Sequence, residues 1–310
     1  MEKKQIILFT GGGGAGSEGL FKILNKKYIV HFADAEKNSK PAFIPEDNWH
    51  NIEGAKSKIF LKRLLSLCKK LKISILVPTV DEELEIIALN KKRFDCKILL
   101  PDIEFIKNHL DKYKSYLLLS KNKVSVAKTY ALSNYIKLKY PLIIKPRFGR
   151  GSRHVAKIKN KKQLNSYLNL FEYNYKDVIA QEYLDGDEYT VMVLANKNDL
   201  ISVVPVKVTS KKGITIRGYT TNNRKIINLC KQFHKKFKVF GYYNIQLIKK
   251  NNDYKIIEIN PRISTTACLC LAAGIDFLKI FSIKESVKDL TKYKKNLHMK
   301  RSWINEFYLK

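Results

Sequence analysis

Long hydrophobic runs are missing from this sequence of 310 residues. No stretch approaches the roughly 18 apolar residues that a membrane-spanning helix needs. The apolar residues 6–9 follow two lysines, but a glycine run ends them before they reach the length of a signal-peptide core. We therefore expect a soluble, cytoplasmic protein without a membrane partner. Hydrophobic residues still make up 45% of the chain, enough for two or three compact units.

Cysteine and acidic residues are also scarce. The five cysteines are odd in number, and only Cys268 and Cys270 lie close together, without the two-residue gap of a thiolate metal site. We expect reduced structural thiols. Asp and Glu number 28 against 59 Lys and Arg, a net charge of +31. Because the lysines are scattered through every segment and form no patch with interleaved aromatic residues, the pattern argues against nucleic acid as a partner.

The first hundred or so residues predict a small parallel α/β domain. An apolar, β-branched run at 5–10 leads into the glycine run, and a helical pattern and a second strand follow. A further strand at 73–77 leads into a helix whose first turn holds Asp81, Glu82 and Glu83. Acidic residues at this position complement the helix dipole, so we expect a capping role for them and not a catalytic one.

From residue 111 the pattern changes to an α+β arrangement, with runs of strands and few helices. The expected elements are helices at 111–119 and 160–171 and strands at 142–145, 155–158, 178–184, 188–195 and 201–208. In the second of these helices, Leu164, Tyr167, Leu168 and Phe171 share one face, which predicts a buried side. We expect the basic and aromatic tail, residues 293–310, to pack as a last strand.

The glycine run supports an alternative function. Gly11, Gly13 and Gly16 match the G-x-G-x-x-G spacing of dinucleotide-binding turns, and Asp34 closes the second strand where a ribose-binding acid is expected. An NAD(P)-dependent oxidoreductase is therefore one hypothesis. The motif is weak by itself because any tight strand-to-helix turn tolerates glycine. The rest of the chain does not read as a dehydrogenase substrate domain.

The strongest chemical signal is a hairpin of two strands, 244–248 and 256–260, joined by a polar loop. A register centred on residue 252 places Gln246 opposite Glu258 and Asn244 opposite Asn260. These side chains share one face of the hairpin because side chains alternate along a strand. A carboxylate with neighbouring amide oxygens suits Mg²⁺.

The residues after this hairpin add an anion-binding group. Pro261 ends the strand, and Arg262 leaves it beside the predicted metal site, where its guanidinium can grip a phosphate or carboxylate with two hydrogen bonds. An exposed polar strand face without a metal is the plainer alternative.

A second motif surrounds Lys145, which ends an apolar strand. The following loop, residues 146–154, is rich in glycine and arginine, and the glycines allow backbone N–H groups to approach a phosphate. No Gly-Lys-Ser/Thr occurs and a strand follows, so it is not a Walker loop. A hairpin lid over a triphosphate fits better, with an ordinary basic turn as the alternative.

A third motif spans residues 178–190. An apolar strand that runs into an exposed segment can present backbone donors and acceptors to an adenine edge, and Glu188 can accept hydrogen bonds from ribose hydroxyls. A solvated acidic loop explains this segment equally well when it is taken alone.

Together, in this order and spacing, the motifs resemble the ATP-grasp superfamily, in particular the ATP-binding half-modules of the carbamoyl phosphate synthase large subunit. The most specific match is Glu-Ile-Asn-Pro-Arg-Ile-Ser at 258–264. The resemblance covers nearly the whole chain. It implies an α/β plus α+β fold, with a Rossmann-like pre-ATP-grasp domain at 1–108 and a two-subdomain ATP-grasp domain at 109–310. The lid subdomain would span about 115–183 and the metal-binding subdomain about 184–310.

The resemblance also implies roles in binding ATP and Mg²⁺ (or Mn²⁺). The residues that would contact or cover the phosphates are Lys112, Lys145, Gly149, Arg150, Gly151 and Ser152, and Lys145 would also lie near the adenine. Those that would meet the adenine and ribose are Gln181, Glu182, Tyr183, Leu184 and Glu188. Gln246, Glu258 and Asn260 would bind the metal. Arg262 would stabilise the transferred phosphoryl group, and Arg262, Asn260 and Lys145 are the expected catalytic residues.

The sequence also departs from carbamoyl phosphate synthase. The arginine that this family carries three residues after Arg262 is Thr265 here, and a single module without a second half speaks against bicarbonate as the substrate. For the negative charge of another acceptor we consider Lys207 and Arg217 besides Arg262, because they flank a segment that contains Gly213.

These features predict an ADP-forming ligase that activates a small carboxylate as an acyl phosphate and joins it to an amine or, as a lesser alternative, a thiol. A non-catalytic ATP-binding regulator is the other alternative that keeps the fold. Relatives of this kind often pair, so the prediction includes a homodimer.

Overall fold

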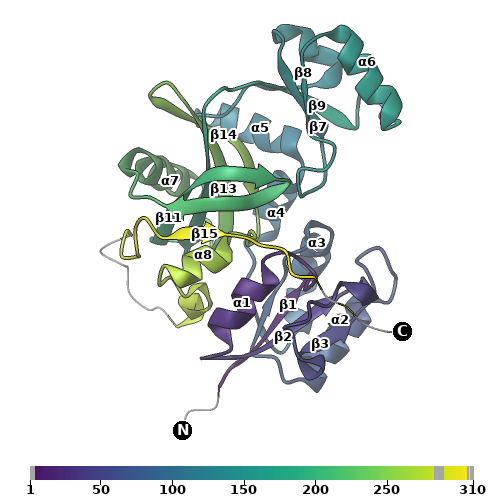
Figure 1. Cartoon of the computed structure of the whole chain (residues 1–310), viewed down its shortest axis with the longest axis vertical. Coiled ribbons are helices and arrows are strands. Elements are labelled where there is room, and N and C mark those ends of the chain that lie inside the picture. Colours follow the sequence, from purple (N-terminus) through teal and green to yellow (C-terminus); the bar gives the residue numbers. More distant parts are fainter. Residues whose placement is uncertain (1–3, 283–289, 306, 308–310) are drawn as a thin grey trace.

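The structure, a computed structural model, describes residues 4–282, 290–305 and 307. Its elements form three sheets with helices packed against them (Figure 1). No helix in these ranges combines the length and the apolar character that crossing a bilayer demands.

Five parallel strands form the N-terminal sheet, in the order β3-β2-β1-β4-β5. Its elements are β1 (Ile6–Thr10), α1 (Ser17–Leu24), β2 (Ile29–Asp34), η1 (Lys37–Ser39), η2 (Glu46–Asn48), β3 (Trp49–Asn51), α2 (Phe60–Lys70), β4 (Ile75–Val77), α3 (Asp81–Leu89), η3 (Lys91–Arg93), β5 (Lys97–Ile98) and α4 (Ile103–Leu110). Phe9 packs in one core with Leu20 of α1, whereas Leu8 packs on the opposite face with Leu64 of α2. Both faces are covered, which explains the continuous apolar run of β1 and confirms the predicted parallel α/β unit.

A four-stranded sheet, in the order β6-β9-β7-β8, projects from the body and carries α6 on one face (Figure 1). The elements in residues 112–182 are α5 (Lys112–Lys121), which packs against the central sheet, and β6 (Thr129–Ala131), η4 (Leu132–Lys137), β7 (Leu142–Pro146), β8 (Ala156–Ile158), α6 (Lys161–Leu170) and β9 (Val178–Glu182). The sheet has its own core, in which Leu164, Tyr167 and Leu168 of α6 are buried and Phe171 packs against them. The predicted buried face of this helix is confirmed.

Six strands form the central sheet, in the order β14-β13-β10-β11-β12-β15, with antiparallel pairing throughout. Its elements are β10 (Asp187–Ala195), β11 (Leu200–Lys212), β12 (Ile214–Thr220), α7 (Arg224–Phe237), β13 (Gly241–Lys250), β14 (Asp253–Asn260), α8 (Ala267–Ala272), η5 (Phe277–Phe281) and β15 (His298–Lys300). Successive side chains of β13 point into two different cores. Tyr243 packs with Phe233 of α7, and Tyr242 belongs to the core that contains α8.

The core on the α8 side continues into the N-terminal sheet. Phe9 of β1, Leu20 of α1 and Tyr242 of β13 belong to one buried cluster. Gly19 allows the close approach of α1 and α8, because a Cβ atom there would lie 2.7 Å from the Cβ of Cys268. The N-terminal and central sheets therefore form one packed body, while the four-stranded sheet keeps a separate core.

Most predicted elements are present. The hairpin register is confirmed: Gln246 pairs with Glu258 and Asn244 with Asn260. All five cysteines are free thiols. The expected last strand at 293–310 was too long, because only His298–Lys300 pairs, with β12, and residues 306 and 308–310 lie outside the described part. The residue boundaries proposed for the domains stay predictions.

Candidate functional site

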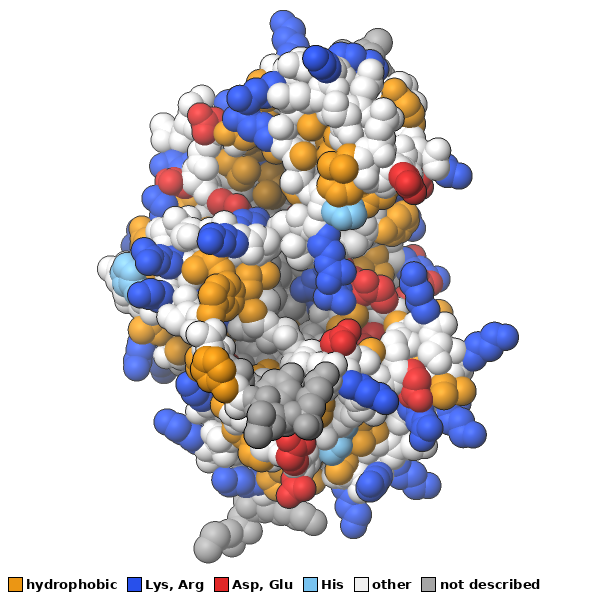
Figure 2. Space-filling view, turned by 45° about the vertical axis from the view of Figure 1, so that its right-hand side comes forward, with side chains coloured by type: hydrophobic (Ala, Val, Ile, Leu, Met, Phe, Trp, Pro, Cys, Tyr) orange, Lys and Arg blue, Asp and Glu red, His pale blue; other side chains and the backbone are white. Residues whose placement is uncertain are grey.

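An open cleft of about 1360 Å³ lies between the N-terminal sheet, the four-stranded sheet and the central sheet. Figure 2 shows the hollowed face, with basic and acidic side chains near one another around the hollow. The cleft is lined by fifteen of the predicted site residues: Lys112, Lys145, Gly149, Arg150, Gly151, Ser152, Gln181, Glu182, Tyr183, Leu184, Glu188, Gln246, Glu258, Asn260 and Arg262. Segments up to 150 residues apart in sequence therefore meet at one site.

The hairpin β13–β14 forms the floor of the cleft. Gln246, Glu258 and Asn260 all line it. Asn244, their fourth partner on this face, is fully buried and donates to Thr190 Oγ1 over 2.8 Å. Asn244 thus holds β13 against β10, while the other three oxygen-bearing side chains border the open space.

This donor set fits a hard cation. The described residues contain no group of three His, Cys, Asp or Glu side chains placed to hold a metal. Any metal bound on this face would therefore meet one carboxylate and two amides, with room left for water and phosphate oxygens. Such an oxygen-only set matches Mg²⁺ or Mn²⁺ better than Zn²⁺.

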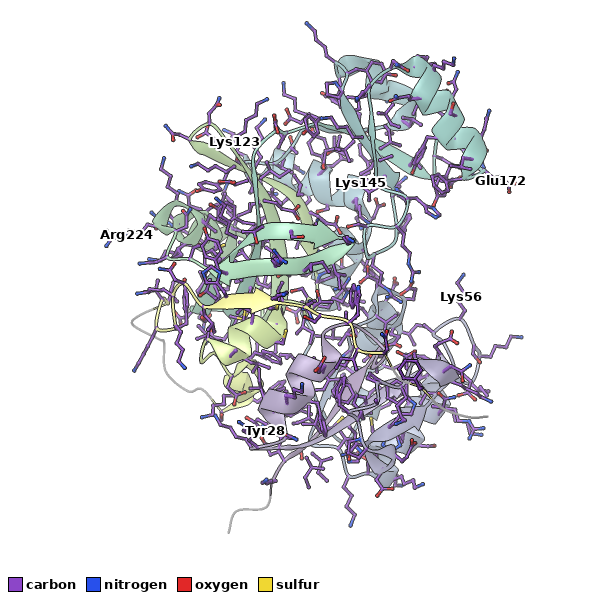
Figure 3. The ribbon with its side chains drawn as sticks, in the orientation of Figure 1. Tyr28, Lys56, Lys123, Lys145, Glu172 and Arg224 are labelled. Carbon is purple, nitrogen blue, oxygen red and sulfur yellow. The ribbon has the colours of Figure 1, made fainter. Side chains whose placement is uncertain are left out.

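Lys145 lies where the four-stranded sheet meets the body (Figure 3). Its ammonium group donates to Gln181 Oε1 over 3.2 Å and to the carbonyl of Ile257 over 3.1 Å, and lies 3.8 Å from Glu258 Oε2. Burial lowers the pKa of Lys145 to about 8. The negative charge of Glu258 raises this pKa, whereas the positive charges of Lys112 and Lys211 lower it further. The buried cation is thus satisfied by oxygen atoms and aimed at the floor of the cleft.

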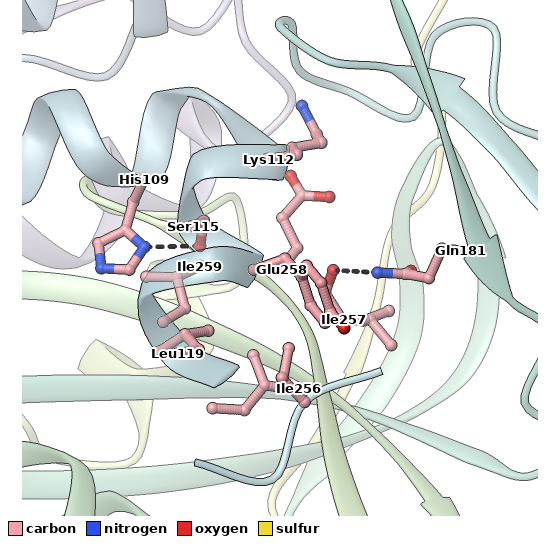
Figure 4. A pocket seen from close by; sticks show the side chains of 11 residues that line it. His109, Lys112, Ser115, Leu119, Gln181, Ile256, Ile257, Glu258 and Ile259 are labelled. Carbon is pink, nitrogen blue, oxygen red and sulfur yellow. Dashed lines mark hydrogen bonds between the residues drawn. The ribbon is translucent and has the colours of Figure 1, made fainter. Parts of the chain in front are cut away.

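Figure 4 shows the wall where α5 and β14 meet. Gln181 donates to the carbonyl of Ile257 over 3.3 Å and to Thr129 Oγ1 over 2.9 Å. The Glu258 carboxylate extends toward Lys112 in this view. Gln181 therefore ties β9 to β14 and fixes the place of Lys145 above the floor.

The glycine-rich loop after β7 is anchored at both ends but open in the middle. Gly149 and Gly151 have positive φ values of 113° and 70°, and a Cβ atom at either one would meet nothing within 4 Å. Lys112 Nζ donates to the carbonyl of Gly149 over 2.6 Å, and Ser152 Oγ donates to the carbonyl of Gly213 over 3.0 Å. The loop thus spans the cleft with exposed backbone, as a phosphate cradle would.

The segment after β9 forms another edge of the cleft. The N–H of Glu182 donates to the carbonyl of Lys128, and its carboxylate binds Lys255 Nζ at 2.7 Å. The N–H is therefore already used within the protein. The ring of Tyr183 lies under Lys157, with Nζ 3.5 Å from the ring centroid.

Glu188, the predicted ribose ligand, is paired with Lys211 at 2.5 Å. Lys207 and Arg217 are not among the residues that line the cleft. Lys207 pairs with Asp187 at 2.9 Å, and Arg217 is exposed on β12 opposite Lys300. The structure thus does not bring these two predicted acceptor-binding residues to the others.

The three acids lie in the first turn of α3, where they complement the helix dipole as expected. The N-cap residue, Val80, makes no side-chain hydrogen bond, and two of the acids have partners across the cleft. Asp81 forms an ion pair with Arg262, and Glu82 binds Arg150 at 3.1 Å. Asp81 and Glu82 therefore connect α3 to the two arginines of the predicted phosphate site.

The glycine run is used for packing. The N–H of Gly13 donates to Asp34 Oδ2 over 2.9 Å, so the acid expected for a ribose already holds the turn. Gly11 has φ +64°, and a Cβ atom at Gly16 would lie 3.3 Å from the backbone of Thr265. A tight turn and a close approach account for these glycines without a dinucleotide.

Two residues that contact segments lining the cleft, without lining it themselves, were missed in the sequence. Asp111 caps α5 and also binds Arg147 in a bidentate ion pair, with distances of 2.8 and 2.6 Å. Burial raises the pKa of Asp111, but hydrogen bonds from Arg147 and from backbone N–H groups outweigh this effect, so the pKa is lowered. Arg301 donates to the carbonyls of Ala15 and Thr265. The cap of α5 was readable from Asp-Lys-Tyr, whereas no local signal marks Arg301.

Comparison with known proteins identifies the family and the fold. A family model described as an ATP-grasp domain matches residues 109–266, just over half of the chain. The chain belongs to the ATP-grasp family. A second model, described as a PylC-like N-terminal domain, matches residues 7–99. This ATP-grasp protein therefore carries the N-terminal α/β unit and the ATP-grasp fold that the sequence predicts.

Curated relatives match parts of this ATP-grasp chain. A D-alanine–D-alanine ligase of Petrotoga mobilis is 27% identical over 199 residues, which cover 56% of this chain and 65% of the relative. A carbamoyl phosphate synthase large chain of Clostridium botulinum is 28% identical over 142 residues, which cover 42% of this chain and 13% of the relative. The match thus spans less than two thirds of either relative.

Solved structures share the fold over most of the chain. A biotin carboxylase of Campylobacter jejuni has a TM-score of 0.69 and 15% identity, with 96% of this chain and 74% of the other covered. An L-amino acid ligase of Bacillus licheniformis has a TM-score of 0.66 and 15% identity, with 90% and 73% covered. At these identities the likeness establishes the fold alone.

Proposed function

We propose that this protein is an ADP-forming ATP-grasp ligase that joins a small carboxylate to an amine, or alternatively a thiol, through an acyl phosphate. One observation carries the proposal: Gln246, Glu258 and Asn260 face the same cleft as Lys145 and the open glycine-rich loop. An oxygen-only metal face opposite a backbone cradle suits a triphosphate with its cation. The catalytic power of such a site lies in positioning and in charge neutralisation.

Each element of the cleft has a role in this proposal. Residues 149–152, with Lys112 and Lys145, would hold the phosphates, and the metal-binding residues of the hairpin would hold Mg²⁺ or Mn²⁺, which neutralises charge when bound. Gln181 and the backbone carbonyls of Glu182–Leu184 would face the adenine, since the N–H of Glu182 already donates to the carbonyl of Lys128. Glu188 would meet the ribose only after it exchanges its partner Lys211.

Arg262 acts on the acceptor in this scheme. It leaves β14 two residues after Asn260 and lines the cleft, and its guanidinium donates to Asn260 Oδ1 over 3.5 Å and to Asp81. The acceptor carboxylate would attack the γ-phosphate beside this cation, and the amine would then displace phosphate from the acyl carbon. Thr265, in place of the arginine expected for carbamoyl phosphate synthase, makes bicarbonate a poor acceptor here.

The domain division at residue 108, a homodimer and a cytoplasmic location also belong to the proposal. Light scattering on the purified protein checks the dimer. The division is supported by the two family models, which end at residue 99 and begin at residue 109.

Thermal unfolding tests nucleotide choice first. A ligand at about 100 times its dissociation constant stabilises a protein by about 2.7 kcal/mol. We expect a shift with Mg·ATP that chelator removes, and none with NAD or NADP. A shift with a nicotinamide cofactor alone would overturn the proposal in favour of the oxidoreductase. A phosphate-release screen of carboxylates and amines then separates a ligase from an ATP-binding regulator.

A further inference from the structure

Glu83, in the first turn of α3, is a buried carboxylate with an unpaired oxygen. It is 6% exposed and lines the cleft. Thr10 provides one hydrogen bond to the carboxyl group, but Oε2 has no hydrogen-bond partner. Leaving a buried carboxylate oxygen unpaired is costly, so its retention indicates a ligand that completes it.

The surroundings of Glu83 select a cation. Asp34 and Glu82 line the same cleft, and both are near enough for their charges to act on Glu83. Burial raises the pKa of Glu83 to about 7, and the charges of Asp34 and Glu82 add to this, while Thr10 and Arg150 act against it. A bound cation would favour the ionised carboxylate and remove the conflict between the neighbouring negative charges.

The position of Glu83 connects it to the reacting groups. Asp81 and Glu82, in the same helical turn, contact Arg262 and Arg150 respectively. Glu83 therefore belongs to the helical turn whose other two acids contact the arginines that border the proposed phosphate site. A nucleophile held at this turn would enter the cleft beside the activated acyl group.

We infer that Glu83, with Asp34 and Glu82 near it, binds a primary-amine substrate as its ammonium ion and takes up the proton that the amine loses before it attacks the acyl carbon. This inference rests on the proposed function and deepens it, because it chooses the amine over the thiol. An ammonium group has three donors and one positive charge, which suit an unpaired carboxylate oxygen in an acidic corner. A neutral thiol or an anion such as bicarbonate offers neither.

Binding and turnover are measured on the full chain and two variants. Glu83→Gln removes the charge at nearly constant volume. Glu85→Gln is the matched control, because Glu85 lies on the same helix but outside the cleft, where it pairs with Lys107 at 3.7 Å. The binding probes, in thermal unfolding with Mg·ADP, are glycine, lysine, ethanolamine and 1,4-diaminobutane. Tetramethylammonium, which has no N–H, and 2-mercaptoethanol serve as comparison ligands.

We expect at least one primary amine to stabilise the wild type and Glu85→Gln, and to lose that shift in Glu83→Gln. In turnover, the KM for the amine should rise about tenfold in Glu83→Gln, the loss of one charge-assisted hydrogen bond, with the KM for ATP unchanged. Hydroxylamine, largely neutral at working pH, should still trap the acyl phosphate at the wild-type rate.

Different failures point to different errors. If hydroxamate forms with ATP but no amine shifts the wild type, or the shift survives in Glu83→Gln, the amine site is overturned and the ligase stands. An equal shift with tetramethylammonium also overturns the site, since it requires no N–H donor. If no carboxylate yields hydroxamate although an amine binds through Glu83, the proposed ligase fails and the amine site remains.

Discussion

The β13–β14 hairpin and the first turn of α3 both present carboxylates to one cleft, but they differ in how far their roles are visible in sequence. In the hairpin, alternation and a symmetric register bring Gln246, Glu258 and Asn260 together by local geometry alone. In α3, Asp81 and Glu82 look like ordinary first-turn acids, and their arginine partners lie 181 and 68 residues away. Local pairing can be read from spacing, whereas a contact across the cleft depends on how two units pack.

The hairpin side of this comparison is tested most strongly by Glu258→Gln, which removes the only carboxylate of the proposed metal face. We expect phosphate release to fall by about a thousandfold, since both charge neutralisation and positioning are lost. The Mg²⁺-dependent part of the thermal shift with ATP should disappear. Asp253→Asn, at the exposed start of the same strand, is the control. Unchanged turnover in Glu258→Gln would remove the metal face from the mechanism.

The α3 side is tested by the pH dependence of stability at Glu83. Its folded pKa of about 7 lies above the ordinary value, so ionisation opposes folding. The wild type should therefore lose stability as pH rises from about 4.5 to about 7, by about 3 kcal/mol in total. Glu83→Gln lacks this loss and should be the more stable protein at about pH 8, with little difference at about pH 4.

Urea unfolding across this pH range measures the effect. A Glu83→Gln variant that is less stable than the wild type at about pH 8 would mean that the carboxylate is well satisfied in the free protein. The reason to assign it a ligand would then be gone.

A smaller effect separates helix-dipole stabilisation from ion pairing at Asp81. Asp81→Asn leaves the mostly buried guanidinium of Arg262 without its charged partner, which should cost about 2 kcal/mol in unfolding free energy. Glu104→Gln changes a comparable first-turn acid of α4 and should cost less than about 1 kcal/mol. Equal losses in the two variants would mean that the helix dipole alone accounts for the effect of Asp81.

The smallest effect is expected at Glu82. Its side chain is 45% exposed and that of Arg150 is 32% exposed, so Glu82→Gln should change stability by less than about 1 kcal/mol. Its effect should appear instead in the KM for ATP, because Arg150 belongs to the glycine-rich loop. High salt should reduce the difference between wild type and variant. A difference insensitive to salt would mean that the pair acts through packing.

Much of the candidate site was predictable because short motifs carry it. The strand stop at Pro261 and the glycines at 149 and 151 follow from local backbone requirements, and the ATP-grasp resemblance that such motifs support named the fifteen residues that line one cleft. Lys207 and Arg217 were chosen only because they flank Gly213, without a pairing argument, and the structure places them outside that cleft. Proximity in sequence to a turn carries no information about which side of a sheet a residue faces.

The amino-acid sequence by itself determined the elements, the hairpin register and the oxygen-bearing face. These depend on how side chains repeat along a single helix or along two neighbouring strands. Only the tertiary structure decided that Gly19 lets α1 pack against α8, that Arg301 binds both Ala15 and Thr265, and that Glu83 is left with an unpaired oxygen. Each of these depends on surfaces from distant segments, and desolvation and pairing at such surfaces are set only when the segments meet.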